Sequence, residues 1–299
     1  MRKKTKKPVT DFAEYVIESI DGQPRWSKLK NLSIESANAT LEEWARADAL
    51  RSSNDTNGRY SRQGGINRRI MIGTMAMLAL KLKAHGVQLG PNVTPWLGKR
   101  VHELIANWHK ANATGGNLYV QDGFTSAVYR LLAYDKICYQ AQDEIWQNGI
   151  KGIDENGYVA TEITRGRRAL VYHLRYLNYL LFLRAARRSL GIHTRPWEER
   201  RLKALGALIC RTQCDQKEMS SKANSTDMEI PGDWGTRVLV AFGEDLLTQD
   251  WEACGTKVKA FGDPSDGGDL NIVKKMFDDL AAQRDKQAKN SDAQPPKEI

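Results

Sequence analysis

The sequence of 299 residues predicts an all-α fold. Apolar residues recur every three or four positions in many segments, whereas the alternation typical of strands is weak throughout. The hydrophobic content of 41% is enough for a real core. Polar, turn-rich segments separate the helical ones, so we expect antiparallel helical hairpins. Because the composition does not shift sharply, we expect one domain over residues 31–283, a basic arm over 1–30 and a polar, disordered tail over 284–299.

The apolar spacing also places the individual helices. Thr94 suits a helix N-cap and Pro95 the first helical position, and Thr194 and Pro196 give a second start of this kind. A long polar loop, 52–65, lies between the first two predicted helices, and such loops inside a compact domain are often functional. Residues 112–117 break a helix, and 215–235 are rich in turn formers. Helices are expected over 36–51, 66–85, 94–111, 124–135, 136–148, 167–191, 196–213, 236–252 and 270–283.

The charge balance indicates an anionic partner. A net charge of +9 and a pI near 9.3 suit nucleic acid, a membrane surface or an acidic polysaccharide, and charge alone does not choose among them. The sequence has no apolar run long enough for a transmembrane helix. The basic start at residues 1–7 is not followed by the apolar stretch of a signal peptide. We therefore expect a cytoplasmic protein, or one given without its leader.

Motifs for metals and phosphates are missing from the sequence. It contains no phosphate loop, no nucleophile elbow and no His-Glu-x-x-His zinc motif. The four cysteines lack the spacing of a zinc site, and we expect core thiols at all of them: Cys138, Cys210, Cys214 and Cys254. No metal or cofactor is expected.

The segment from Asp154 to Gly191 carries the most chemistry. Arg165 and Tyr172 are seven positions apart, which is about two helical turns, so both can project from one helix face. Arg168 is one turn from Tyr172. Positive charge favours phenolate over phenol, and a phenolate can act as a general base. On spacing alone, an ordinary buried tyrosine beside a solvated arginine face remains an alternative.

A second segment, Gly115 to Asp122, lies between two predicted helices. Asn117, Tyr119 and Gln121 offer side chains that can hydrogen-bond the carboxyl or hydroxyl groups of a ligand. The alternative is a glycine helix cap followed by polar turn residues.

The quoted residues resemble a known family. The run Asp154-Glu-Asn-Gly-Tyr-Val-Ala-Thr-Glu-Ile-Thr-Arg-Gly-Arg-Arg-Ala-Leu-Val-Tyr-His173 is similar to the signature of the family-five polysaccharide lyases, the bacterial alginate lyases that act on poly-mannuronate. Residues 96–119 resemble the helix that leads into that family's Asn-Asn-His-x-Tyr-Trp motif. Gly267-Gly-Asp-Leu270 is similar to a C-terminal motif, and residues 57–82 to the N-terminal active-site arm. The resemblance covers residues 40–275.

The resemblance implies an incomplete α/α toroid of helical hairpins around a deep groove, and metal-independent β-elimination at a uronic acid. It implies that Arg165 binds the substrate carboxylate and that Tyr172 is both base and acid. Aligned on Leu118-Tyr119, the chain has Gly116 in place of the family's asparagine and Asn117 in place of its histidine. Asn117 then becomes the candidate that neutralises the carboxylate. His173 is a rival base, but in a regular helix it points about 100° away from Tyr172, which favours a structural role.

The function predicted first is therefore a lyase of a uronic-acid polymer, acting as a monomer on an anionic polysaccharide, with no nucleic acid or membrane as partner. Two alternatives stay open: a toroid that binds the polymer without cleaving it, and a basic nucleic-acid-binding protein, although no nucleic-acid motif is present. The resemblance implies a periplasmic or secreted protein, whereas the chain shows no signal peptide. The predicted catalytic residues are Tyr172, Arg165 and Asn117, and the predicted substrate contacts are Gln121, Tyr119, Arg168, His173, Asn57, Arg59 and Tyr60.

Overall fold

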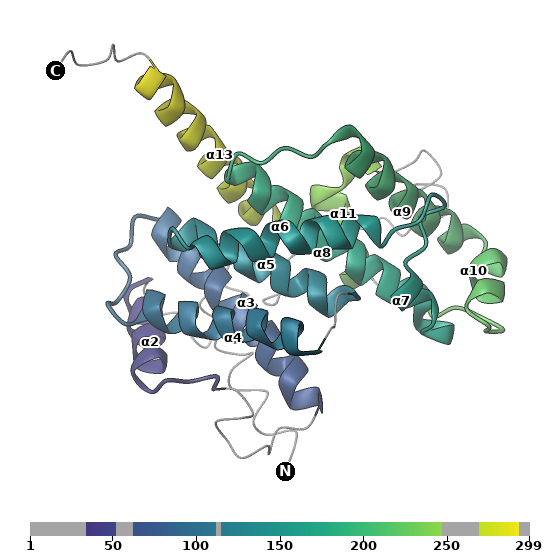
Figure 1. Ribbon diagram of the computed structural model, residues 1–299, viewed down its shortest axis with the longest axis horizontal. Helices are drawn as coiled ribbons and strands as arrows, with labels where there is room; N and C mark the ends of the chain where they lie inside the picture. The colour runs from purple at the N-terminus through teal and green to yellow at the C-terminus, as the bar shows by residue number, and fades with distance from the viewer. Residues whose placement is uncertain (1–33, 52–61, 112–114, 232, 247–268, 293–299) are drawn as a thin grey trace.

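The computed structural model describes residues 34–51, 62–111, 115–231, 233–246 and 269–292, and its regular elements there are helices (Figure 1). One isolated antiparallel bridge joins Ile153 to Val159. The predicted all-α fold is confirmed for this part of the chain, and none of its helices is long and apolar enough to cross a membrane. In order they are α2 (Ile34–Arg46), α3 (Arg62–Ala84), α4 (Val93–Ala111), α5 (Asn117–Leu132), α6 (Lys136–Lys151), α7 (Ala160–Ile163), η3 (Gly166–Arg168), α8 (Ala169–Ser189), α9 (Pro196–Cys214), α10 (Lys217–Lys222), α11 (Asp233–Phe242), η4 (Glu244–Leu246) and α13 (Leu270–Asp292).

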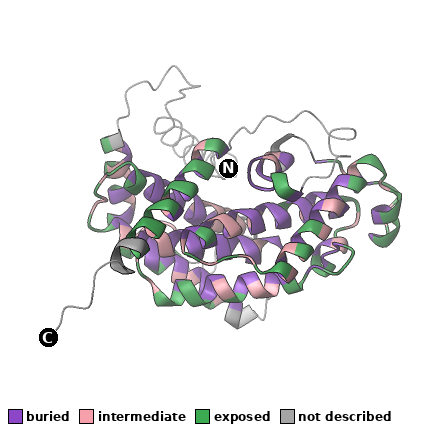
Figure 2. Ribbon diagram, turned by 90° about the horizontal axis from the view of Figure 1, so that it is seen from above, coloured by how far each residue is buried: buried purple, intermediate pink, exposed green. Residues whose placement is uncertain are grey.

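Helices α5 and α8 pack against each other at the centre of the molecule. Helix α5 also contacts α3, α4 and α6, while α8 contacts α9, α11 and α13. Buried residues therefore occupy the middle of the bundle, and exposed residues lie on its outward faces (Figure 2). In α5, 13 of 16 residues are buried, so this helix has no broad solvent-facing side.

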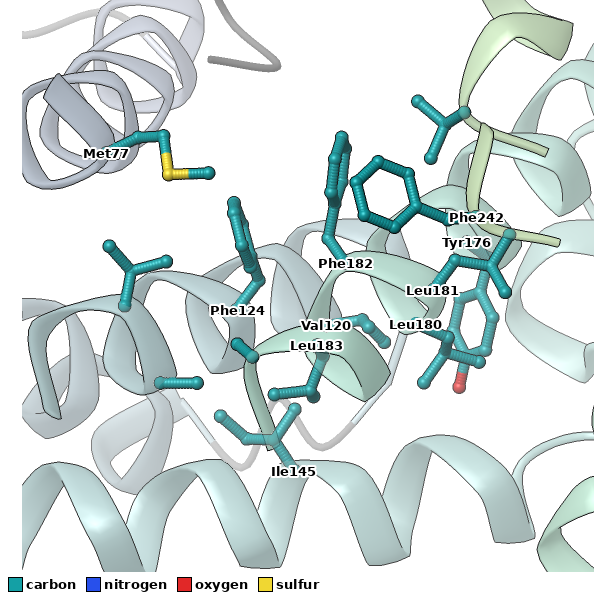
Figure 3. Packing of buried hydrophobic residues seen from close by; sticks show 14 of the residues in the cluster. Met77, Val120, Phe124, Ile145, Tyr176, Leu180, Leu181, Phe182, Leu183 and Phe242 are labelled. Carbon is teal, nitrogen blue, oxygen red and sulfur yellow. The ribbon is translucent and has the colours of Figure 1, made fainter. Parts of the chain in front are cut away.

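Aromatic rings join α5 to α8 and α11. Phe182 of α8 lies between Phe124 of α5 and Phe242 of α11, with ring centroids 5.0 and 5.1 Å apart (Figure 3). Tyr176 of α8 donates its buried hydroxyl to the carbonyl oxygen of Gly149 in α6 at 2.8 Å, which gives the polar tip a partner inside the core. These contacts fix α8 relative to α5, α6 and α11.

The start of α5 differs from the prediction. The sequence predicted a break through residue 117 and a helix from 124, whereas the helix begins at Asn117, directly after Gly116. Asn117, Gln121 and Asp122 lie buried in its first turns. In the sequence, these polar residues resemble those of a loop. Because other helices enclose α5 on most sides, its apolar residues do not follow the periodic pattern that identifies an amphipathic helix.

Smaller differences lie near the C-terminus. Helix α13 continues to Asp292, beyond the predicted end at 283, so the predicted disordered tail begins as helix. Helix α11 ends at Phe242, earlier than predicted. Helix α10 forms within the segment 215–235 that was predicted to be rich in turns, and the short helix α7 forms where no helix was predicted. Cys138 and Cys210 are buried free thiols as expected, whereas Cys214 is disulfide-bonded, so that expectation was wrong. The arm 1–30, most of the loop 52–65 and Cys254 lie outside the described residues.

A tight turn precedes α7 and depends on Gly157. The carboxylate of Asp154 accepts the backbone N–H groups of Asn156 and Tyr158 at 2.9 and 2.8 Å. Gly157 has a φ of +91°, which side-chain-bearing residues rarely adopt. A Cβ atom there would also overlap the backbone of Ala204 in α9. The turn at Asn156 and Gly157 therefore packs closely on α9.

We expect Gly157→Ala to lower the free energy of unfolding by about 3 kcal/mol or more, because the left-handed strain adds to a clash with backbone atoms. Gly86→Ala is the matched control. Gly86 has a φ of +79° and open space at its Cβ position, so it should lose only about 1–2 kcal/mol. Urea denaturation measures both. Equal losses would show that the contact with α9 contributes nothing.

Candidate active site

A buried carboxylate connects two of the predicted catalytic residues. Glu162 of α7 is fully buried, and its Oε1 accepts the backbone N–H of Asn117 at 2.7 Å and the side-chain Nδ2 of Asn117 at 3.3 Å. Its Oε2 accepts from Nε of Arg165 at 3.4 Å. Asn117 and Arg165, 48 positions apart in the sequence, are thereby held on the two oxygens of one side chain.

Glu162 also caps the N-terminus of α5, because its carboxylate accepts a backbone N–H of the first turn. Asn117 is the first residue of that helix, and its N–H is one of the groups that have no partner within a helix. A carboxylate at this position also interacts favourably with the helix dipole. Burial raises the pKa of Glu162, while the Asn117 hydrogen bonds and the Arg165 charge oppose that rise. The preceding Gly116 has a φ of +88°, and a Cβ there would lie 3.2 Å from Oε1 of Glu162.

Arg165 reaches from this carboxylate to Tyr172. Its Cζ lies 4.9 Å from the centroid of the Tyr172 ring, and its side chain is 40% exposed. Cζ of Arg175 lies 5.6 Å from the same ring. Two guanidinium groups thus lie within cation–π distance of the half-buried Tyr172 ring. Arg165 and Tyr172 are neighbours as predicted, but the reason given was wrong, because Arg165 precedes η3 and does not share a helix with Tyr172.

Arg168 has a different environment from the one predicted. Its Nε lies 3.2 Å from a carboxylate oxygen of Glu229, and the neighbouring Arg167 pairs with Asp227 at 3.1 Å. The backbone N–H of Glu229 also donates to the carbonyl oxygen of Arg167 at 2.8 Å. The arginine-rich turn therefore holds the segment after α10, and Arg175 takes the place beside Tyr172 that we expected for Arg168.

His173 belongs to the core. It is fully buried, its Nδ1 donates to the carbonyl oxygen of Ala169 at 2.8 Å, and its Nε2 accepts the backbone N–H of Val159 at 3.0 Å. Burial lowers its pKa to about 4, so the ring is neutral near pH 7. This geometry agrees with the structural role and contradicts the predicted substrate contact, since both nitrogens are already used.

The other predicted contacts are buried or undescribed. Tyr119 is 3% exposed; its ring packs edge-on against Trp108 and its hydroxyl accepts from Asn148 at 3.0 Å, so it is a core residue rather than a contact. Gln121 is also buried, and within the described ranges its Oε1 has no hydrogen-bond partner. Asn57, Arg59 and Tyr60 lie outside the described residues.

Two residues of the site were missed from the sequence. Glu162 stands three positions before Arg165 inside the quoted signature, and that spacing could have suggested an ion pair. Arg175 follows Tyr172 by three positions on α8, where i,i+3 neighbours meet.

A possible metal-binding group lies elsewhere. Among the described residues, His102, Asp135 and Cys138 place their ligand atoms within 4.8 Å of one another. Asp135 already accepts the backbone N–H of Cys138 and pairs with His102, so this group is satisfied as a helix cap.

Comparisons with known proteins show the family and the fold of this chain. The sequence model described as alginate lyase matches residues 15–217, which is more than half of the chain. The chain belongs to the alginate lyase family. It is 31% identical over 107 residues to a polysaccharide lyase of Stenotrophomonas maltophilia, covering 36% of this chain and 32% of that protein. It is 22% identical over 222 residues to an alginate lyase of Pseudomonas fluorescens, covering 70% and 57%. The chain thus spans between 32% and 59% of the length of the curated relatives it matches.

Solved structures confirm the fold. A histidine-to-alanine variant of alginate lyase A1-III complexed with a tetrasaccharide superposes with a TM-score of 0.68 at 16% identity, covering 89% of this chain and 78% of that one. Alginate lyase A1-III from Sphingomonas species A1 gives a TM-score of 0.63 at 15% identity, covering 89% and 76%. The chain therefore has the α/α-toroid fold predicted from the resemblance.

Asp122, the residue after Gln121, is a buried carboxyl group whose ionisation should make the stability of the fold depend on pH. It is 1% exposed; its Oδ2 accepts from Nε1 of Trp108 at 2.7 Å and lies 3.4 Å from Nε of Arg69. Burial raises its pKa to about 6, against the opposing effects of Arg69 and Trp108. Because the folded-state pKa is raised, the protonated carboxyl stabilises the fold below about pH 4, and this contribution is lost as the pH rises through about 6.

We expect the stability of the parent, relative to Asp122→Asn, to fall by on the order of 3 kcal/mol between pH 4 and pH 7. The amide variant cannot ionise, so it lacks this loss. Denaturant titrations of both proteins across the range measure the difference. Parallel pH profiles would mean that the carboxyl stays ionised in the fold at pH 4.

Proposed function

We propose that this protein is a polysaccharide lyase that cleaves a uronic-acid polymer by β-elimination, with Tyr172 as base and acid. The observation that carries the proposal is the contact between Arg165 and the Tyr172 ring, in a network that continues through Glu162 to Asn117. Family membership supports the same reaction class.

The reaction follows from the chemistry of a uronate. The phenolate oxygen of Tyr172 takes the proton on C5, the C5–H electron pair forms the C4–C5 double bond, and the C4–O bond to the next sugar breaks. The new phenol returns its proton to the departing glycosidic oxygen. One glycosidic bond becomes one hydroxyl group and one unsaturated sugar end, so no further reactant is needed.

The C5 proton is weakly acidic, and the carboxyl group beside it must accept developing charge. Arg165 supplies a guanidinium for that carboxylate, and the amide of Asn117 supplies a hydrogen-bond donor. Both are held by Glu162, so they need little reorganisation as charge develops. The protein's side chains thus provide the base, the acid and the stabilising charge.

The substrate we propose is alginate, in particular its poly-mannuronate blocks. Relatives named alginate lyase support this choice, and the net charge of +9 suits a polymer with one carboxylate per sugar. The alternative is a toroid that binds the polymer without cleaving it. The burial of Asn117, whose side chain already bonds Glu162, favours this alternative, because a committed amide has less capacity to bind substrate.

We expect Tyr172→Phe to reduce elimination about a thousandfold or more, because the proton acceptor is gone while the ring and its packing remain. The assay is ultraviolet absorbance of the unsaturated sugar end, with poly-mannuronate, poly-guluronate and poly-glucuronate as substrates. Polymer binding and the thermal midpoint should change little.

His173→Gln is a useful companion variant, since the structure assigns that ring to the core. It should lose stability more than it loses turnover per folded molecule. A folded Tyr172→Phe protein with more than a few per cent of the parent rate would exclude Tyr172 as the base. A parent that binds a polyuronate but releases no unsaturated product would favour the non-cleaving alternative.

A further inference from the structure

The turn between α5 and α6 exposes aromatic side chains that the candidate active site does not use. Tyr134 is 96% exposed, and Ile137 and Tyr139 are 50% and 44% exposed. Apart from Ile230, these are the large hydrophobic residues that are exposed in the described part of the chain. Single exposed apolar residues are ordinary, but such a cluster marks an interaction surface.

Arg130, in the last turn of α5, lies against both tyrosines. Its Cζ is 4.4 Å from the centroid of Tyr134 and 5.9 Å from that of Tyr139. Across the described ranges it takes part in no salt bridge, and its Nε is buried without a hydrogen-bond partner. A guanidinium that is held by aromatic rings and lacks a carboxylate can accept one from a ligand.

The charges around this cluster favour an anion. The nearby Asp135 is turned away: its Oδ1 accepts the N–H of Cys138, and its Oδ2 lies 3.0 Å from Nε2 of His102. Lys83 donates to the carbonyl oxygen of Leu132 at 2.8 Å, which places an ammonium at the end of α5. Lys136 is exposed beside Asp135.

We propose that Arg130, Tyr134 and Tyr139 form a second binding site for the same carboxylate-bearing polysaccharide, at the opposite end of α5 from Asn117. The proposal rests on the proposed function for the identity of the polymer. Arg130 pairs with a sugar carboxylate, and the exposed rings present flat apolar faces to the C–H groups of the sugar rings.

The position of the second site relative to Tyr172 predicts how this site affects the cleavage of long polymers. Figure 1 shows α7 beside the start of α5. With 16 residues, α5 separates that end from the Arg130 end by about 24 Å. A long polymer held at Arg130 therefore stays close to Tyr172, which raises its effective concentration there. A short oligosaccharide cannot occupy both places, so the second site matters for polymer only.

The test is native gel electrophoresis of the full chain, carrying Tyr172→Phe to keep the polymer intact, in gels with and without poly-mannuronate. Arg130→Gln and Tyr134→Ala should each raise the dissociation constant for the polymer about fivefold to tenfold. Tyr134→Phe should keep the parent value. Arg200→Gln, an exposed arginine of α9, removes the same charge elsewhere and should also keep it. With Tyr172 intact, turnover of a tetrasaccharide should be unchanged in all four variants.

Four results would overturn the proposal. They are no retardation of the parent, equal retardation of parent and Arg130→Gln, an equal loss in Arg200→Gln, and a dimer that dissociates on Tyr134→Ala, which would make the cluster a self-association surface. The outcome is separable from the lyase assignment. A parent that is retarded through Arg130 and Tyr134 but releases no unsaturated product retains the second site and refutes catalysis.

Discussion

The arrangement of the candidate site depends on the buried carboxylate of Glu162. One oxygen holds the first residue of α5, and the other faces Arg165, which lies over Tyr172. A buried carboxylate is costly unless its oxygens are paired, so Glu162 stabilises the fold only while Asn117 and Arg165 keep these positions. The contacts with Asn117 and Arg165 that offset the cost of burying Glu162 therefore also position the residues that we assign to catalysis.

The packing of α5 against α8 makes this interaction possible. Phe124 and Phe182 stack between the two helices, and the turn at Gly157 brings α7 back towards the start of α5. The arginines on either side of Arg165 have different tasks. Arg168 is bound to Glu229, whereas Arg165 and Arg175 face the Tyr172 ring. Charge at the site is thus a result of the tertiary arrangement and not of the number of arginines in the turn.

The sequence predicted the helical fold, the family and the proximity of Arg165 to Tyr172, because apolar periodicity and a long signature are local properties. It failed at the start of α5, where a helix buried on most sides lacks an amphipathic pattern. It also failed at Tyr119 and at Arg168, whose surroundings come from Asn148 and Glu229, far away in the chain. The role of Glu162 depends on its contact with Asn117, which is distant in the chain, and no local sequence pattern shows such a contact.

A double-mutant cycle in kcat/KM between Glu162→Gln and Arg165→Ala tests the central role of Glu162 most directly. If Glu162 acts by holding Arg165, much of the loss caused by Glu162→Gln should disappear once Arg165 is alanine. We predict a coupling energy of about 1 kcal/mol or more, within the range for residues in contact. The remaining loss is the part that acts through Asn117. Strictly additive losses would contradict the account, since Glu162 and Arg165 would then influence the reaction independently.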